Sequence, residues 1–177
     1  MILFMSNSGE SLPIAWRINQ AGGDARIYMH SPRYKSNYDG LVERLPLSKI
    51  LWAVKRADAV VFDIVRPNEG TKQDLTLLKA FRANQKSPEV FGAVADKMRK
   101  YTRVIGASSE TSTWELDRSK GAEIAKKVGI KTPNSVEFST LQDGVKFLQK
   151  QDDNRWVFKP HDNQDLDLTY VESWLGE

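Results

Sequence analysis

Polar residues with ligand-binding potential follow the first apolar run of the chain. Asn7, Ser8, Gly9 and Glu10 come directly after residues 2–5 and precede a helical pattern. Such a turn places backbone N–H groups at a helix N-terminus, where an anion is stabilised. It has neither the three-glycine pattern of dinucleotide-binding loops nor the glycine and lysine pattern of a P-loop. The turn therefore either holds an anionic ligand or only connects a strand to a helix.

Charged residues near the end of a later apolar run form a second candidate site. Asp63 lies within the run 59–65, and Arg66 and Glu69 follow in a turn. The two carboxylates could bind ribose hydroxyls or an amine, and Arg66 could bind phosphate. The alternative is an ordinary turn with solvated charges.

Two lysines extend the list of candidate ligand-binding residues. Lys120 lies in a helical pattern over residues 119–128, and Lys159 ends a short apolar strand before a proline. A side chain at the end of a strand often contacts a ligand, whereas a helix lysine is usually a surface residue. No pairing of a nucleophile with a base is visible, so no catalytic residue is assigned.

Alternating strand and helix patterns must position these residues. Strands are predicted over residues 2–5, 25–29, 59–65 and 103–105, with helices over 11–21, 47–56 and 74–83. This order predicts an α/β fold, with a Rossmann-like parallel sheet and helices on both faces, over residues 1–106. Residues 107–177 form a second segment, with helices over 119–128 and 140–149 and strands over 135–138 and 156–158.

The composition excludes several kinds of site. The 177 residues include no cysteine and only two histidines, so disulfides and thiolate sites are excluded and no metal site is assigned. No apolar run approaches the roughly 20 residues of a membrane span, and no signal peptide pattern is visible. We therefore expect a cytoplasmic protein without a membrane partner.

The charge of the chain is distributed unevenly. Residues 1–106 carry 17 Lys and Arg against 10 Asp and Glu, while residues 107–177 carry 9 against 13. A basic N-terminal half could attract phosphate or nucleic acid, or could be a solvated lysine-rich surface. No nucleic-acid-binding motif is present, so no specific nucleic-acid partner is expected.

Taken together, the motifs resemble phosphoribosylamine–glycine ligase (glycinamide ribonucleotide synthetase), of the ATP-grasp superfamily. The stretch "SNSGESLPIAW" stands where that family has a turn like "GNGGREHAL". The stretch "IGASSETSTWELDRSKGAEIAKKVGIKTP" is similar to the family's "ARLEGSKAFAKDFMKRHGIPTA", and "WVFKPHD" to its "VVKPDG". The resemblance covers nearly the whole chain. The diverged sequence pattern is similar to that of ligase-like proteins encoded by bacteriophages.

This resemblance implies a role in purine biosynthesis for each candidate. Residues 1–106 would be a pre-ATP-grasp domain, and 107–177 a linker and the incomplete first part of an ATP-grasp domain. Lys120 and Lys159 would bind ATP, with Mg²⁺ as the second cofactor of the full-length family. The family activates a carboxylate as an acyl phosphate, which an amine then displaces. A small phosphorylated amine substrate would bind at Asn7, Ser8, Gly9, Glu10, Asp63 and Arg66.

The chain also departs from the family pattern. The stretch "NQDLDLTYV" has no glycine-rich loop, the first turn has lost its arginine, and the second ATP-grasp lobe is missing. We therefore expect the N-terminal part of a carboxylate–amine ligase, inactive alone, with the remainder of the ligase chain as its partner. No cofactor is assigned to this chain by itself. The alternative is a non-catalytic Rossmann-like module that binds a nucleotide, a phosphorylated sugar or a partner protein.

Overall fold

The computed structural model describes residues 1–34, 36, 39–63, 72–83, 90–151, 156–159 and 170–171. The chain divides into two compact units, Met1–Thr113 and Trp114–Glu177. Helix α5 (Ser109–Leu116) spans this division. The domain boundary expected after residue 106 stays a prediction.

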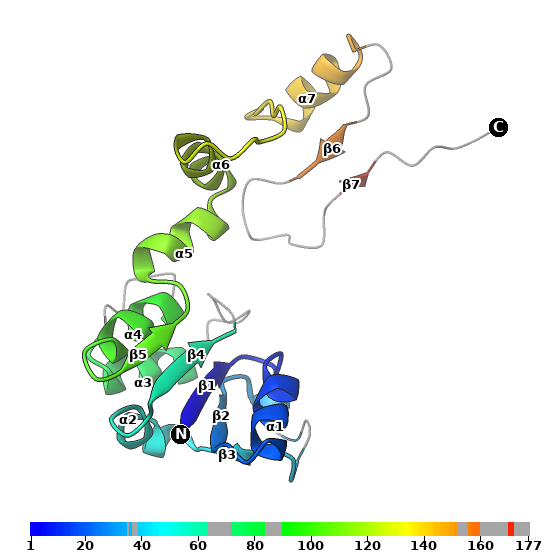
Figure 1. Cartoon of the computed structure of the whole chain (residues 1–177). Coiled ribbons are helices and arrows are strands. Elements are labelled where there is room, and N and C mark those ends of the chain that lie inside the picture. The colour runs from blue at the N-terminus through cyan, green and yellow to red at the C-terminus, as the bar shows by residue number, and fades with distance from the viewer. Residues whose placement is uncertain are drawn as a thin grey trace, which may run out of the picture. The chain divides into compact units, whose positions relative to one another are not determined.

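A five-stranded parallel sheet forms the centre of the first unit (Figure 1). Its order is β3-β2-β1-β4-β5, and every neighbouring pair is parallel. This order places the first strand in the centre of the sheet. The chain adds β2 and β3 on one side of β1 and then β4 and β5 on the other side, as in Rossmann-like folds. The predicted α/β fold class is therefore confirmed for this unit. The strands are β1 (Ile2–Ser6), β2 (Ala25–Met29), β3 (Glu43–Arg44), β4 (Ala59–Phe62) and β5 (Arg103–Ile105).

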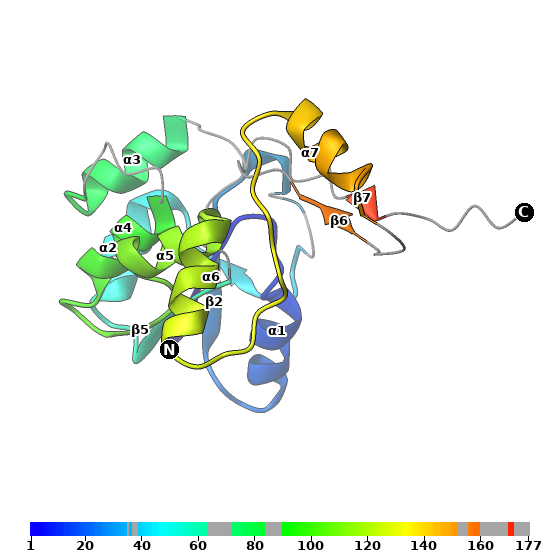
Figure 2. The same ribbon diagram turned by 90° about the horizontal axis from the view of Figure 1, so that it is seen from above.

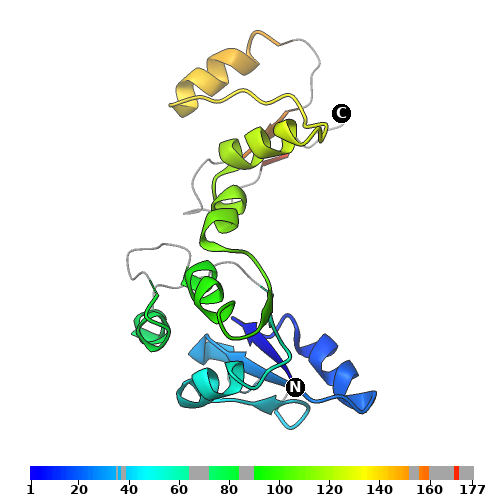
Figure 3. The same ribbon diagram turned by 60° about the vertical axis from the view of Figure 1, so that its left-hand side comes forward.

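Helices cover both faces of the sheet. Helix α1 (Leu12–Gln20) packs on one face, while α2 (Leu47–Val54), α3 (Lys72–Ala80) and α4 (Val90–Met98) cover the other (Figures 2 and 3). Successive residues of a strand point to opposite faces. In β1, Phe4 accordingly packs in the α1 layer, whereas Leu3 and Met5 pack with the other three helices. All three are almost fully buried, which explains the continuous apolar run of this strand.

Helix α4 and strand β3 are among the elements that were not predicted. Helix α4 lies in a stretch whose charged residues, proline and glycine obscured the helical pattern, yet Phe91, Val94 and Met98 are buried in the core. Strand β3 has only two residues, both charged, and pairs with the outer edge of β2. The strand predicted over 59–65 ends at Phe62, and Val65 lies outside the described residues.

The second unit contains two helices and a small antiparallel sheet. These are α6 (Arg118–Lys127), α7 (Leu141–Leu148), β6 (Val157–Phe158) and β7 (Tyr170–Val171). The predicted strand over 135–138 is wrong, because these residues are extended without pairing to another described strand. Phe147 of α7 instead packs between Phe138 and Trp156, with ring centroids 5.2 and 5.1 Å away. None of residues 114–151 and 156–159 is buried.

Membrane insertion of a helix has no support in the described part of the chain. None of the helices there combines the length and the apolar character that a bilayer crossing requires.

Candidate functional site

The loop after β1 is held by a small network of serine hydroxyls. Ser6 Oγ accepts a hydrogen bond from the Gly9 amide at 2.8 Å and donates one to Glu10 Oε2 at 3.1 Å. Gly9 has a φ of +104°, a conformation that other residues rarely adopt. The loop therefore depends on glycine for its turn and on Ser6 for the placement of Glu10.

Glu10 is kept ionised by its neighbours. Its carboxylate accepts hydrogen bonds from the Ser8 amide at 3.2 Å and from Ser8 Oγ. Burial by itself raises the pKa of Glu10, but hydrogen bonds from Ser8, from its own amide and from Ser6 outweigh burial and lower the pKa. The site therefore carries a negative charge at neutral pH.

A second carboxylate joins this loop from the neighbouring strand. Asp63 follows β4 directly, and its Oδ2 accepts a hydrogen bond from the Ser11 amide at 2.9 Å. Ser11 is the residue that precedes α1. Because β1 and β4 flank the point where the strand order reverses, Asp63 and the loop meet where α/β sheets commonly hold ligands.

Two polar atoms at this junction have no hydrogen-bond partner among the described residues. They are Asp63 Oδ1 and Ser11 Oγ, and both are covered from solvent. Ser11 as a whole is 3% exposed. A buried polar atom without a partner costs about 1–3 kcal/mol, and the cost is larger for a charged group. A ligand hydroxyl could donate to the carboxylate and accept from the serine.

The donors expected to hold an anion are already engaged. The amides of Ser8, Gly9 and Ser11 donate to Glu10, Ser6 and Asp63, in that order. Two carboxylates of the chain thus stand at the beginning of α1, where the positive end of the helix dipole stabilises negative charge. A phosphate group at this loop would encounter negative charge and occupied donors.

The remaining residue of the loop has a structural contact. Asn7 is 4% exposed, and its carbonyl accepts a hydrogen bond from the Ser31 amide at 3.1 Å. The neighbouring His30 is also buried, with Nδ1 3.2 Å from Tyr28 Oη and its ring against Phe91. In the described part of the chain, no group of three or more His, Asp or Glu residues could hold a metal ion.

The other predicted site residues lie elsewhere in the chain. Lys120 lies in the first turn of α6, where its amide donates to Asp117 Oδ1 at 3.0 Å. Lys159 follows β6 and is exposed. Both belong to the second unit, and Arg66 lies outside the described residues. The structure thus joins residues 7–10 to Asp63 through Ser11, and their ligand-binding role stays a prediction.

Three residues near this edge were missed by the sequence analysis. Ser6 and Ser11 flank the predicted loop, and their hydroxyl groups were a signal that could have included them. Arg44 gave no such signal. All three side-chain nitrogens of Arg44 are covered and form no hydrogen bond with the residues that the structure describes. Asp39 forms an ion pair with Arg44, with Oδ1 3.0 Å from Nη1.

Comparisons with known proteins add little to this geometry. No family model matches the chain, and no curated protein matches it. Among solved structures, shikimate dehydrogenase from Thermotoga maritima is similar over 75% of this chain and 52% of that chain, with 14% identity and a TM-score of 0.35. This chain therefore spans about half the length of that dehydrogenase. The Rossmann-like assignment rests on the strand order described above.

The resemblance to phosphoribosylamine–glycine ligase is wrong. The matching order of short motifs suggested it, but no family model and no curated protein matches the chain. The associated expectations of an ATP-grasp segment, a ligase activity and a role in purine biosynthesis are wrong with it. Motifs such as a Lys-Pro after a strand or a Ser-Lys in a helix are short enough to arise in unrelated α/β proteins.

Proposed function

We propose that the first unit is a non-catalytic binding module for nucleosides, nucleotides or sugars, which bind through their hydroxyl groups. The ligand lies at the carboxyl ends of β1 and β4. The observation that carries the proposal is the pair of covered atoms that have no hydrogen-bond partner within the described part of the chain, Asp63 Oδ1 and Ser11 Oγ. They belong to two residues that are already joined by a hydrogen bond, so both atoms lie at the same junction.

The charge of the site supports a ligand that donates hydrogen bonds. Hydrogen bonds to a charged group contribute about 1.5–3 kcal/mol each, and ionised carboxylates only accept. The adjacent hydroxyls of a ribose offer donors to both Asp63 and Glu10. A phosphate on the same ligand would lie away from this loop, because the two carboxylates repel it.

The same contacts argue against catalysis by the loop. Ser8 Oγ donates a hydrogen bond to the Glu10 carboxylate, and this pair resembles a nucleophile beside a general base. However, the lowered pKa of Glu10 makes its carboxylate a weak base at neutral pH. We therefore assign Glu10 to binding and not to proton transfer.

Binding of a nucleoside with and without its ribose hydroxyls tests this proposal. Adenosine and uridine should raise the unfolding temperature of the full chain, by about 4–8 °C per kcal/mol of stabilisation for a domain of this size. The 2′,3′-dideoxy analogues should raise it far less. Equal shifts by both would contradict recognition through the hydroxyls.

Matched carboxamide variants locate the site. Asp63→Asn removes one charge and should weaken binding about tenfold, as measured by isothermal titration calorimetry. Asp24→Asn is the control, because Asp24 is a surface carboxylate that pairs with Arg26 before β2, at the opposite edge of the sheet. If both variants bind the nucleoside as well as the unmodified chain does, the proposal is wrong.

A further inference from the structure

A cluster of basic and aromatic side chains lies at the amino-terminal edge of the sheet, opposite the site proposed above. Its members lie in the last turn of α2, in the segments that follow α2 and α4, and at the beginning of β5. All of them are exposed. We call this cluster the basic–aromatic patch, and it consists of Trp52, Lys55, Arg56, Lys100, Tyr101 and Arg103.

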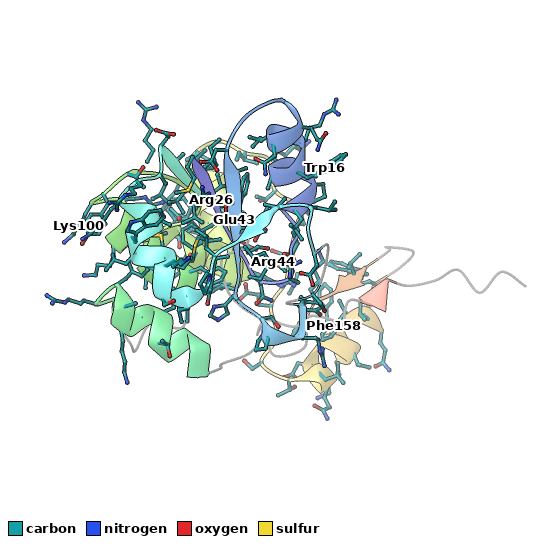
Figure 4. The ribbon with its side chains drawn as sticks, turned by 90° about the horizontal axis from the view of Figure 1, so that it is seen from below. Trp16, Arg26, Glu43, Arg44, Lys100 and Phe158 are labelled. Atoms are coloured by element: carbon teal, nitrogen blue, oxygen red, sulfur yellow. The ribbon has the colours of Figure 1, made fainter. Side chains whose placement is uncertain are left out.

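Contacts between the two segments hold the patch together. Thr102 Oγ1 donates to the Ala57 carbonyl at 2.7 Å. Arg103, the first residue of β5, is in register with the first residue of β4. Lys55 Nζ lies 5.5 Å from the ring centroid of Tyr101. The segments 55–57 and 101–103 are therefore side by side, and Lys100 points outward from this end of the unit (Figure 4).

The two aromatic rings are unusually open to solvent. Trp52 is 47% exposed and Tyr101 is 50% exposed. Each carries a cation over its ring, and Arg56 Cζ lies 4.6 Å from the centroid of Trp52. A large ring usually buries most of its area, so an exposed ring beside cations suits a partner that has both flat apolar groups and negative charge.

The positive charge of the patch is not neutralised by nearby acids. Asp58 pairs with the amino group of Met1 at 2.6 Å, and Asp96 pairs with Arg99 at 2.8 Å. Within the described residues, none of the four cations of the patch forms an ion pair with a carboxylate. Lys49 and Lys97 lie about one helical turn before Trp52 and Lys100 and add two further positive charges to α2 and α4.

We propose that the basic–aromatic patch binds single-stranded nucleic acid without sequence preference. Unpaired bases stack on Trp52 and Tyr101, and the backbone phosphates contact the lysine and arginine side chains. Aromatic rings interleaved with cations are how proteins hold single strands, because every base has a flat face. A duplex keeps its bases stacked on one another and offers the rings no such face. This proposal is independent of the ligand site at the other edge.

Fluorescence anisotropy with the full chain and a labelled 20-nucleotide oligothymidylate tests the electrostatic part. Each phosphate contact adds about 0.7 to the salt dependence for single strands, so four contacts predict a slope of about −2.8. The affinity should then fall about 50-fold between 50 and 200 mM NaCl. A slope near zero would overturn the proposal.

Two variants with the same change in net charge locate the surface. Lys55→Glu combined with Lys100→Glu should weaken binding more than tenfold and reduce the magnitude of the slope by about 1.4. Lys79→Glu combined with Lys131→Glu reverses two other exposed lysines and should change binding less than twofold. Equal losses for both pairs would show that only the overall charge matters and would overturn the assignment.

A third variant separates stacking from charge. Trp52→Ala should weaken binding at least fivefold while leaving the salt slope unchanged, because it removes a ring and no cation. Circular dichroism confirms that the variant is folded, and Tyr101→Ala provides a second test if it is not. The proposal is overturned if neither ring matters, if a duplex binds more tightly than the single strand, or if phosphatidylserine vesicles are bound and the oligonucleotide is not.

Discussion

Replacing Gly9 by alanine tests the loop that places Glu10. The φ of +104° at Gly9 disfavours any side chain, and a Cβ there would lie 2.7 Å from Leu12 Cδ1 and 3.1 Å from Met29 Cε. Gly22 is a matched control, because its φ is +84° and a Cβ there meets no atom within 4 Å. The two substitutions therefore share the backbone penalty and differ in the contacts.

The expected magnitudes follow from this difference. A left-handed conformation costs a non-glycine residue about 1–2 kcal/mol, and the reduced entropy of the unfolded chain returns about 0.4–1 kcal/mol. Gly22→Ala should therefore lower the free energy of unfolding by about 0.5–1 kcal/mol. Gly9→Ala must also move Leu12 from its rotamer, at about 0.5–1.5 kcal/mol, for a total of about 1–2.5 kcal/mol.

Urea unfolding followed by circular dichroism measures both values under the same conditions. A loss for Gly9→Ala that is equal to or smaller than the loss for Gly22→Ala would refute the reasoning. It would mean that the loop does not hold Gly9 against Leu12 in the way described above.

Three further predictions concern the core, a buried cation and pH. Gly92→Ala should destabilise the protein by about 1–3 kcal/mol in thermal unfolding, because the new Cβ would lie 2.7 Å from the Ser108 carbonyl oxygen. Alanine normally favours a helix over glycine, so a raised unfolding temperature would contradict this close approach. Arg44→Met should raise the free energy of unfolding by about 1 kcal/mol, since the guanidinium is covered and has no hydrogen bond to the described residues. A lower free energy of unfolding would show that the ion pair of Arg44 with Asp39 stabilises the fold. The lowered pKa of Glu10 means that its ionised form stabilises the fold above the ordinary value of 4.5 and that this contribution disappears as the pH falls through the folded pKa. Glu10→Gln should therefore flatten the dependence of the urea midpoint on pH between about 6 and 3, and an unchanged dependence would argue against the serine contacts.

Local pattern was sufficient for several elements of the first unit. The strands β2 and β5 have the predicted bounds, because β2 is a largely buried apolar run and β5 is a short run that ends directly before Gly106. Helices α1 and α2 were predicted within two residues of their ends, because apolar residues recur on one face.

Other elements exist only because of tertiary contacts. Strand β3 has two charged residues and is a strand only because β2 offers it an open edge. Helix α4 contains Gly92 in its first turn, and glycine weakens a helix locally. The close approach of Ser108 to this position nevertheless requires a residue without a side chain there. No periodicity in a single sequence reveals such a neighbour.

For the candidate site, the sequence by itself determined the location. Residues 7–10 and Asp63 lie at the ends of two strands of the predicted parallel sheet, and parallel strands end at the same edge. The sequence did not determine the charge preference, since a loop before a helix predicts bound anions. Only the tertiary structure brought the Asp63 carboxylate to the Ser11 amide across 52 residues of chain. That contact and Glu10 supply the negative charge from within the chain, and this is why we propose a ligand that binds through hydroxyl groups and not through a phosphate.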